Sequence, residues 1–170
     1  MIEVQNITKS FEGTEVLKGI STVFEKGKTN LIIGQSGSGK TVFLKCLLGL
    51  FEADSGKILF EGKRLKKMSV KERSVLRQEM GMVFQGSALF DSMTVEENIM
   101  FPMQMFTQKK NEEIRDRANS VIKRVNLVNA NEKFPDEISG GMKKRVAIAR
   151  AIVMNPKYLF CDEPNSGLDP

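Results

Sequence analysis

The chain has 170 residues, of which 41% are hydrophobic and 28% are charged, and its formal net charge is +5. This length supports one domain with a substantial core and gives no reason to expect a second independent domain. No apolar run approaches the roughly 18 residues that span a bilayer, and residues 1–6 lack the pattern of a secretory signal. These features argue against an integral membrane protein or a secreted protein, and they predict a cytoplasmic one.

The N-terminal region carries β-branched and aromatic residues in partial alternation over residues 2–8 and about 16–25. With Glu12-Gly13 as a turn signal between them, these segments predict two antiparallel strands. Phe11 precedes the turn, where an aromatic ring could offer its face to an adenine base. Considered alone, Phe11 is better explained as a core residue.

A glycine-rich loop follows a short apolar run. Residues 29–33 are suited to a buried strand, and residues 42–50 continue with helix-compatible apolar spacing. Between them lies the pattern G-x-x-x-x-G-K-T of a phosphate-binding loop, formed by Gly34, Gln35, Ser36, Gly37, Ser38, Gly39, Lys40 and Thr41. The glycines let backbone N–H groups approach phosphate oxygens, Lys40 can reach the β- and γ-phosphates, and the Thr41 hydroxyl can ligate Mg²⁺. The alternative, a turn that binds nothing, would leave the strand, the Lys-Thr pair and the helix as coincidence.

The middle of the chain combines short elements with a long apolar segment. Ser69 predicts the N-cap of a helix, and residues 80–84 predict a buried strand that ends at Gln85. Methionine and phenylalanine are then concentrated over residues 86–106. Such clusters can form adaptable docking surfaces, although core packing is the commoner use. Residues 111–128 predict an amphipathic helix.

The last part of the chain predicts a helix and a strand, each with polar residues at one end. The run Ser139-Gly140-Gly141 precedes a predicted helix that reaches about residue 154, and Ser139 could act simply as an N-cap worth about 1 kcal/mol. Residues 158–161 predict an apolar strand that ends in Asp162 and Glu163. Adjacent carboxylates there are costly unless they hold a cation. Downstream of a phosphate loop, they suggest a nucleotide hydrolase in which Asp162 holds Mg²⁺ and Glu163 polarises the attacking water; the alternative is a charged strand end without function.

Together these residues give the chain a resemblance, from end to end, to the ATPase subunit of an ATP-binding-cassette (ABC) transporter. The run Ile138-Ser139-Gly140-Gly141-Met142 matches the family signature L-S-G-G-Q with two substitutions. Gln85 matches the family's lid glutamine, and residues 166–169 match its dimer-contact loop. The resemblance implies an α/β fold: a P-loop NTPase (RecA-like) core with an N-terminal antiparallel β subdomain and an inserted α-helical subdomain. Residues 1–85 and 156–170 would form the nucleotide-binding core and residues 86–155 the helical signature subdomain.

The resemblance also implies roles and partners. Two ATPase subunits would close head to tail as a homodimer, so that Ser139, Gly140, Gly141 and Met142 contact the partner's ATP and Asp169 contacts the partner. ATP and Mg²⁺ would be the cofactors, with Thr41, Gln85 and Asp162 on the metal, Glu163 catalytic and Phe11 stacked on adenine. A membrane permease would be the other partner, the subunit would lie on the inner face of the cell membrane, and no nucleic acid is expected.

Residues 83–95, followed by Asn98 and Phe101-Pro102, are similar to ATPases of the Mla/Mce type, which move phospholipids between bacterial membranes. Two departures from the family pattern stand out. Asn165 replaces the usual Ser or Thr, and the chain stops at Pro170, before the family's further strands and switch histidine. We therefore expect a C-terminally truncated chain, incomplete in its sheet and doubtful in turnover by itself. A soluble ABC ATPase without a transport role and a fragment that binds nucleotide without turnover are the alternatives.

Overall fold

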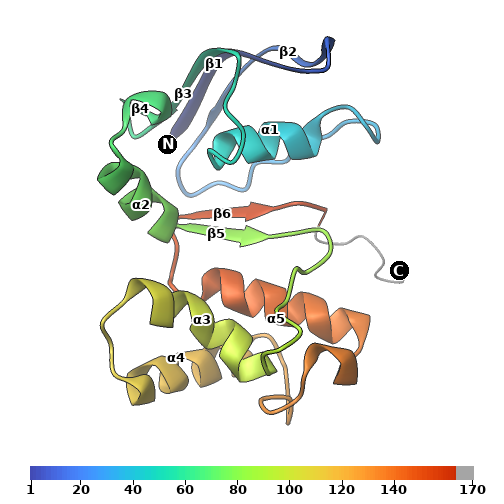
Figure 1. The fold of residues 1–170 in the computed structure, drawn as a ribbon, viewed down its shortest axis with the longest axis vertical. Coiled ribbons are helices and arrows are strands. Elements are labelled where there is room, and N and C mark those ends of the chain that lie inside the picture. The colour runs from blue at the N-terminus through green and yellow to red at the C-terminus, as the bar shows by residue number, and fades with distance from the viewer. Residues whose placement is uncertain (164–170) are drawn as a thin grey trace. The chain divides into compact units, whose positions relative to one another are not determined.

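The computed structural model describes residues 1–163. The chain divides into two compact units, Met1–Val75 and Leu76–Pro170. Figure 1 gives the order of the elements along the chain. The prediction of a core formed by residues 1–85 and 156–170 and a helical subdomain formed by residues 86–155 stays a prediction.

A four-stranded antiparallel sheet dominates the first unit. Its strands are β1 (Ile2–Phe11), β2 (Thr14–Phe24), β3 (Ser55–Phe60) and β4 (Lys63–Arg64), arranged in the order β2-β1-β3-β4. The predicted N-terminal hairpin is confirmed, because Phe11 pairs with Thr14 across the Glu12-Gly13 turn. In that turn both Glu12 (φ 48°) and Gly13 (φ 81°) have the positive φ that a tight hairpin turn requires.

One helix and one helical turn complete most of this unit. Helix α1 (Lys40–Leu47) buries Phe43, Leu44, Cys46 and Leu47, and the ring of Phe43 lies 6.2 Å from that of Phe24 on β2. A single 3₁₀ turn (Leu65–Lys67) precedes helix α2 (Val70–Gln78), which begins in the first unit and ends in the second. The predicted cap of α2 is confirmed, because Ser69 Oγ accepts a hydrogen bond from the N–H of Glu72 and the Ser69 N–H donates one to the Glu72 carboxylate.

The predicted strand at residues 29–33 is wrong for this structure. These residues have no strand geometry, and the side chains of Leu31 and Ile33 are 81% and 84% exposed. A strand needs a hydrogen-bonding neighbour, and within the described chain the sheets contain no partner for this segment. An apolar composition alone therefore did not produce the element.

The second unit contains a two-stranded parallel sheet. Strands β5 (Met80–Val83) and β6 (Tyr158–Cys161) pair in register, from Met80 with Tyr158 to Val83 with Cys161. Both strands were predicted at these places. Parallel pairing brings the two carboxyl ends to the same edge, so the residues that follow Val83 and Cys161 emerge together.

Helices form the larger core of this unit (Figure 1). They are α3 (Val95–Phe106), α4 (Asn111–Arg124) and α5 (Gly140–Ile152), with a 3₁₀ turn (Pro135–Glu137) before α5. Their buried faces meet in one apolar cluster, which includes Ile99, Met103, Ile114, Val121 and Val146. The helices predicted at 111–128 and after Ser139 are thus confirmed, with ends that differ by a few residues.

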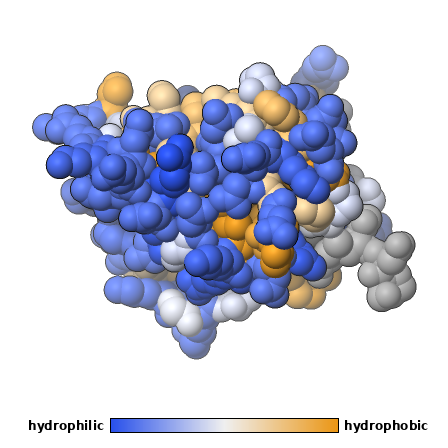
Figure 2. All heavy atoms as spheres, turned by 90° about the horizontal axis from the view of Figure 1, so that it is seen from below, coloured by the Kyte–Doolittle hydropathy of each residue, from blue (hydrophilic) through white to orange (hydrophobic). Residues whose placement is uncertain are grey.

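The face of the molecule drawn in Figure 2 is mostly hydrophilic, and areas of hydrophobic side chains lie among the hydrophilic ones. Across residues 1–163, no helix has the length and apolarity needed to cross a bilayer.

Candidate nucleotide-binding and hydrolytic site

The phosphate loop ends directly on helix α1. Gly39 is the N-cap of α1 at φ 91°, and Gly37 has φ 78°, so both occupy the left-handed region that glycine adopts without strain. A Cβ added to Gly34 would lie 2.6 Å from the Ser38 hydroxyl oxygen. The loop therefore has the tight backbone that lets N–H groups face an anion at a helix N-terminus.

Lys40 spans this loop. Its Nζ donates hydrogen bonds to the carbonyl oxygens of Gly34 (2.8 Å) and Gln35 (2.9 Å), at the start of the loop. The ammonium therefore lies next to the start of the loop. When a phosphate group binds there, its charged oxygens would replace these two carbonyls as hydrogen-bond acceptors for Lys40. Glycine backbone, helix N-terminus and lysine together fit a nucleoside triphosphate.

Phe11 ends strand β1 and is 39% exposed. Its ring packs edge-on against Phe51 with centroids 5.5 Å apart, and Lys9 Nζ lies 5.4 Å from its centroid. The ring is therefore partly committed to a local aromatic pair and keeps some open surface. Adenine stacking on Phe11 stays a prediction.

Three polar residues follow the carboxyl ends of β5 and β6. The N–H of Asp162 extends the ladder by donating to the carbonyl of Val83 at 2.9 Å, and the Asp162 side chain is buried. Gln85 Nε2 donates a hydrogen bond of 2.9 Å to Glu163 Oε2. The structure thus brings together Gln85 and Glu163, which are 78 positions apart in sequence.

The edge where β5 and β6 end suits a divalent cation whose ligands are mostly phosphate oxygens and water molecules. Among residues 1–163 there is no group of three or more His, Cys, Asp or Glu side chains that could enclose a metal by themselves. Mg²⁺ commonly takes one or two protein oxygens and completes its shell with phosphate and water. Asp162 and Gln85 can supply such oxygens, so the residues fit the metal that the sequence predicts.

The signature residues begin helix α5. Ser139 is its N-cap, and its Oγ accepts a hydrogen bond from the N–H of Met142 at 3.3 Å, as predicted. A Cβ on Gly140 or Gly141 would meet no atom within 4 Å, so this helix start is open in the described chain. An open helix N-terminus favours anions, although contact with a partner's ATP stays a prediction. Asp169 lies outside the described residues.

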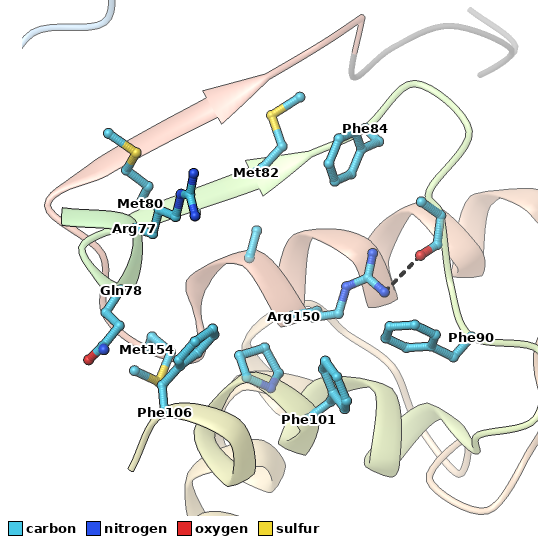
Figure 3. A pocket seen from close by; sticks show the side chains of 14 residues that line it. Arg77, Gln78, Met80, Met82, Phe84, Phe90, Phe101, Phe106, Arg150 and Met154 are labelled. Carbon is cyan, nitrogen blue, oxygen red and sulfur yellow. Dashed lines mark hydrogen bonds between the residues drawn. The ribbon is translucent and has the colours of Figure 1, made fainter. Parts of the chain in front are cut away.

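The second unit contains a pocket of about 300 Å³, lined by residues of β5, α3 and α5 (Figure 3). Its lining is mostly methionine, phenylalanine and arginine, and includes Arg77, Met80, Met82, Phe84, Phe90, Phe101, Phe106, Arg150 and Met154. Sequence analysis predicted an apolar surplus over residues 86–106, and Phe90 and Phe106 are indeed 41% and 48% exposed. It missed Arg150, which reaches from α5 to the loop after Gln85, and no local signal marks that residue.

Comparison with known proteins places this arrangement in a family. The family model described as "ABC transporter" matches residues 17–166 of the chain. The chain therefore belongs to the ABC transporter family, in which it corresponds to the ATP-binding cassette.

Two groups of curated relatives are similar at about the same level. The "Probable ribonucleotide transport ATP-binding protein mkl" of Mycobacterium leprae is 43% identical over 99% of this chain and 49% of its own length. The "Methionine import ATP-binding protein MetN" of Clostridium tetani is 42% identical over 100% of this chain and 53% of its own length. The chain thus spans about half the length of these relatives.

Solved structures agree with the fold. A dimeric bacterial ABC transporter cassette, MJ0796, superimposes with a TM-score of 0.92 at 30% identity, over 99% of this chain and 76% of that one. The same cassette in a dimeric post-hydrolysis state with ADP and Pi gives 0.91 at 29% identity, with the same shares covered. The fold class predicted from the sequence is confirmed.

Proposed function

We propose that this chain is the ATP-binding and ATP-hydrolysing part of an ABC transporter subunit. The observation that carries the proposal is the hydrogen bond between Gln85 and Glu163 at the common edge of β5 and β6. It places an amide and a carboxylate, the two groups needed to orient a metal and a water, within 2.9 Å of each other. The phosphate loop on α1 supports the same conclusion.

We assign the following roles in ATP binding and hydrolysis to the residues of this chain. The phosphate loop would bind the triphosphate through its N–H groups and Lys40, and Thr41, Gln85 and Asp162 would be the residues that offer oxygens to Mg²⁺. Glu163 holds the attacking water and takes its proton, and Gln85 orients Glu163. Bound MgATP supplies the phosphoryl group and most of the metal's ligands.

The proposed partners are a second ATPase subunit and a membrane permease. MJ0796 is described as dimeric, which supports a homodimer in which α5 faces the partner's nucleotide. The pocket beside α3 and α5 offers exposed Phe90 and Phe106 together with the guanidinium of Arg77, a combination suited to an amphipathic helix of a permease. The complex would operate on the inner face of the cell membrane.

We propose a lipid as the cargo, because residues 83–95 resemble the Mla/Mce type. The curated relatives bear names that refer to ribonucleotide transport and methionine import, so they do not support this cargo. An assay of the full-length protein with its permease decides the matter. Stimulation of ATP turnover by phospholipid, and not by methionine or ribonucleotides, is the expected result; the reverse pattern would overturn the lipid cargo.

A pair of variants tests ATP hydrolysis in the full-length protein. Glu163→Gln keeps the shape and the bond to Gln85 but cannot accept a proton, so it should bind MgATP normally and hydrolyse it about 10²-fold or more slowly. Lys40→Ala should lose both turnover and the thermal stabilisation by ATP, which is about 2.7 kcal/mol at 100 times the Kd. Wild-type turnover in Glu163→Gln would refute the assigned role. An ATP-induced melting shift that survives in Lys40→Ala would refute the phosphate loop.

A further inference from the structure

The backbone that presents Gln85 adopts a strained turn. The N–H of Ser87 donates to the carbonyl of Phe84 at 3.0 Å, so Gln85 and Gly86 are the two central residues of the turn. Ser87 (φ 62°) and Ala88 (φ 47°) then follow with positive φ, although neither is glycine. Such conformations cost energy and persist only where the surroundings hold them.

Arg150 provides that hold from helix α5. Its Nη1 donates to the carbonyl of Ala88 and its Nη2 to the carbonyl of Ser87, both at 2.8 Å. The bond to Ala88 is the dashed line in Figure 3. The guanidinium also lies 5.8 Å from the ring centroid of Phe90. A planar fork of this kind fixes two neighbouring carbonyls at once, and the aromatic face restricts its rotation.

Burial adds to the constraint. Ser87 is only 7% exposed, and desolvation lowers the pKa of Arg150 from its ordinary value. The partly buried charge would therefore lose two close carbonyls, which water replaces only in part, if the turn moved away. Arg150 and the backbone at Ser87 and Ala88 should behave as one rigid unit.

We propose that Arg150 is a positioning residue for hydrolysis: it clamps the turn after β5 so that Gln85 stays hydrogen-bonded to Glu163. The proposal rests on the ATPase function proposed above. Arg150 touches neither reacting group; it acts through Gln85, whose Nε2 lies 2.9 Å from Glu163 Oε2. Without the clamp, the turn is free to relax from its strained geometry and the amide leaves the carboxylate.

Helix α4 offers a matched control. Arg117 also donates to two successive carbonyls, from Nε to Val153 (2.9 Å) and from Nη2 to Ile152 (3.3 Å). These carbonyls lie at the end of α5, two and three positions after Arg150, and these two bonds of Arg117 do not involve the turn that carries Gln85. Arg117→Met therefore loses the same kind of interaction as Arg150→Met, without loosening Gln85.

The experiment measures ATP turnover by the full-length protein. Arg150→Met should lower kcat about tenfold or more, with KM and the ATP-induced melting shift unchanged, because misplacing a reacting group affects turnover more than binding. Arg150→Lys, which keeps a cation and donors, should recover part of the loss. Arg117→Met should keep kcat within about twofold even if it melts earlier, because stability and turnover then separate.

A double-mutant cycle with Gln85→Ala decides whether Arg150 acts through Gln85. Arg150→Met should lower kcat less than about twofold further in the Gln85→Ala background, since the residue that it positions is already absent. A loss that multiplies fully in the double variant, or a rise in KM without a fall in kcat, overturns the proposal. If Arg150→Met does not fold, the cycle uses Arg150→Lys. A kcat equal to that of the wild type in Arg150→Lys would then overturn the proposal. Absence of turnover in the wild-type protein would instead refute the proposed function itself.

Discussion

The side chain of Asn98 holds the backbone of a whole loop through its hydrogen bonds. It is 0% exposed on helix α3, and its side chain bonds to the backbone of the loop that precedes this helix. Its Oδ1 accepts from the N–H of Phe90 at 2.9 Å, and its Nδ2 donates at 3.0 Å to the carbonyls of Phe90, Met93 and Thr94. A single amide thus satisfies the buried backbone that connects the Gln85 turn to α3.

Replacing this amide should be costly. Asn98→Leu keeps the volume but leaves the part-buried N–H of Phe90 and the carbonyl of Met93 without this partner, whereas the carbonyls of Phe90 and Thr94 keep a backbone donor. The free energy of unfolding should therefore fall by about 2 kcal/mol. Urea unfolding of the full-length protein measures the change. Asn111→Ala, at an exposed position on α4, is the control and should stay within about 0.5 kcal/mol of wild type. Equal losses in the two variants would show that the network at Asn98 contributes nothing.

At the same scale, the residues that motifs identify differ from those that only the fold reveals. Lys40, Gln85 and Glu163 could be predicted because phosphate and metal chemistry require given residue types at given places along the chain. Arg150 could not, since its partner Ala88 is 62 positions away and is a backbone carbonyl. A backbone carbonyl is present whatever the residue type at position 88, so the sequence carries no trace of the contact.

Strand β5 and helix α5 illustrate packing between elements. A Cβ added to Gly81 on β5 would lie 2.3 Å from the carbonyl oxygen of Ala151, far inside van der Waals contact. Gly81→Ala must therefore push the helix away from the strand, and we expect a loss of about 1–3 kcal/mol in stability. Thermal or urea unfolding measures it. Gly86→Ala, where a Cβ meets nothing within 4 Å, should change stability little; a loss as large as that of Gly81→Ala would contradict this account.

Element prediction succeeded where the signal was local. The caps at Ser69 and Ser139 were found from sequence because each side chain bonds a backbone N–H three residues on. Residues 29–33 gave the opposite result, because a strand depends on neighbours that propensity cannot supply. The register of β5 against β6 was likewise beyond local patterns, although both strands were predicted. Sequence gives the elements more readily than their pairing.

At the scale of the molecule, the unit Met1–Val75 contains ionic contacts that affect stability in acid. Hydrogen bonds lower the pKa of three carboxyls there: Glu52 through Lys66, Asp54 through Lys9 and then the Ser10 N–H, and Glu72 through the Ser69 N–H. A folded-state pKa below the unfolded value favours folding above the unfolded pKa. That contribution disappears as the pH falls through the folded-state pKa.

Asp54 gives the sharpest test, because its bonds to Lys9 (2.7 Å) and to the Ser10 N–H (2.7 Å) join β1 to the residue just before β3. Asp54→Asn keeps an acceptor of the same shape and removes the charge. The variant should melt below wild type at pH 7, and the difference should shrink as the pH falls below about 3.9, where the unfolded aspartate protonates. Melting temperatures of the full-length protein at pH 7, 5 and 3 measure this convergence.

Asp116→Asn, exposed on α4, should follow the wild-type pH dependence. If Asp54→Asn remained below wild type by the same margin at pH 3, the missing charge would not be the cause. At that pH the unfolded aspartate is largely protonated, so the charge must contribute less to folding than at pH 7.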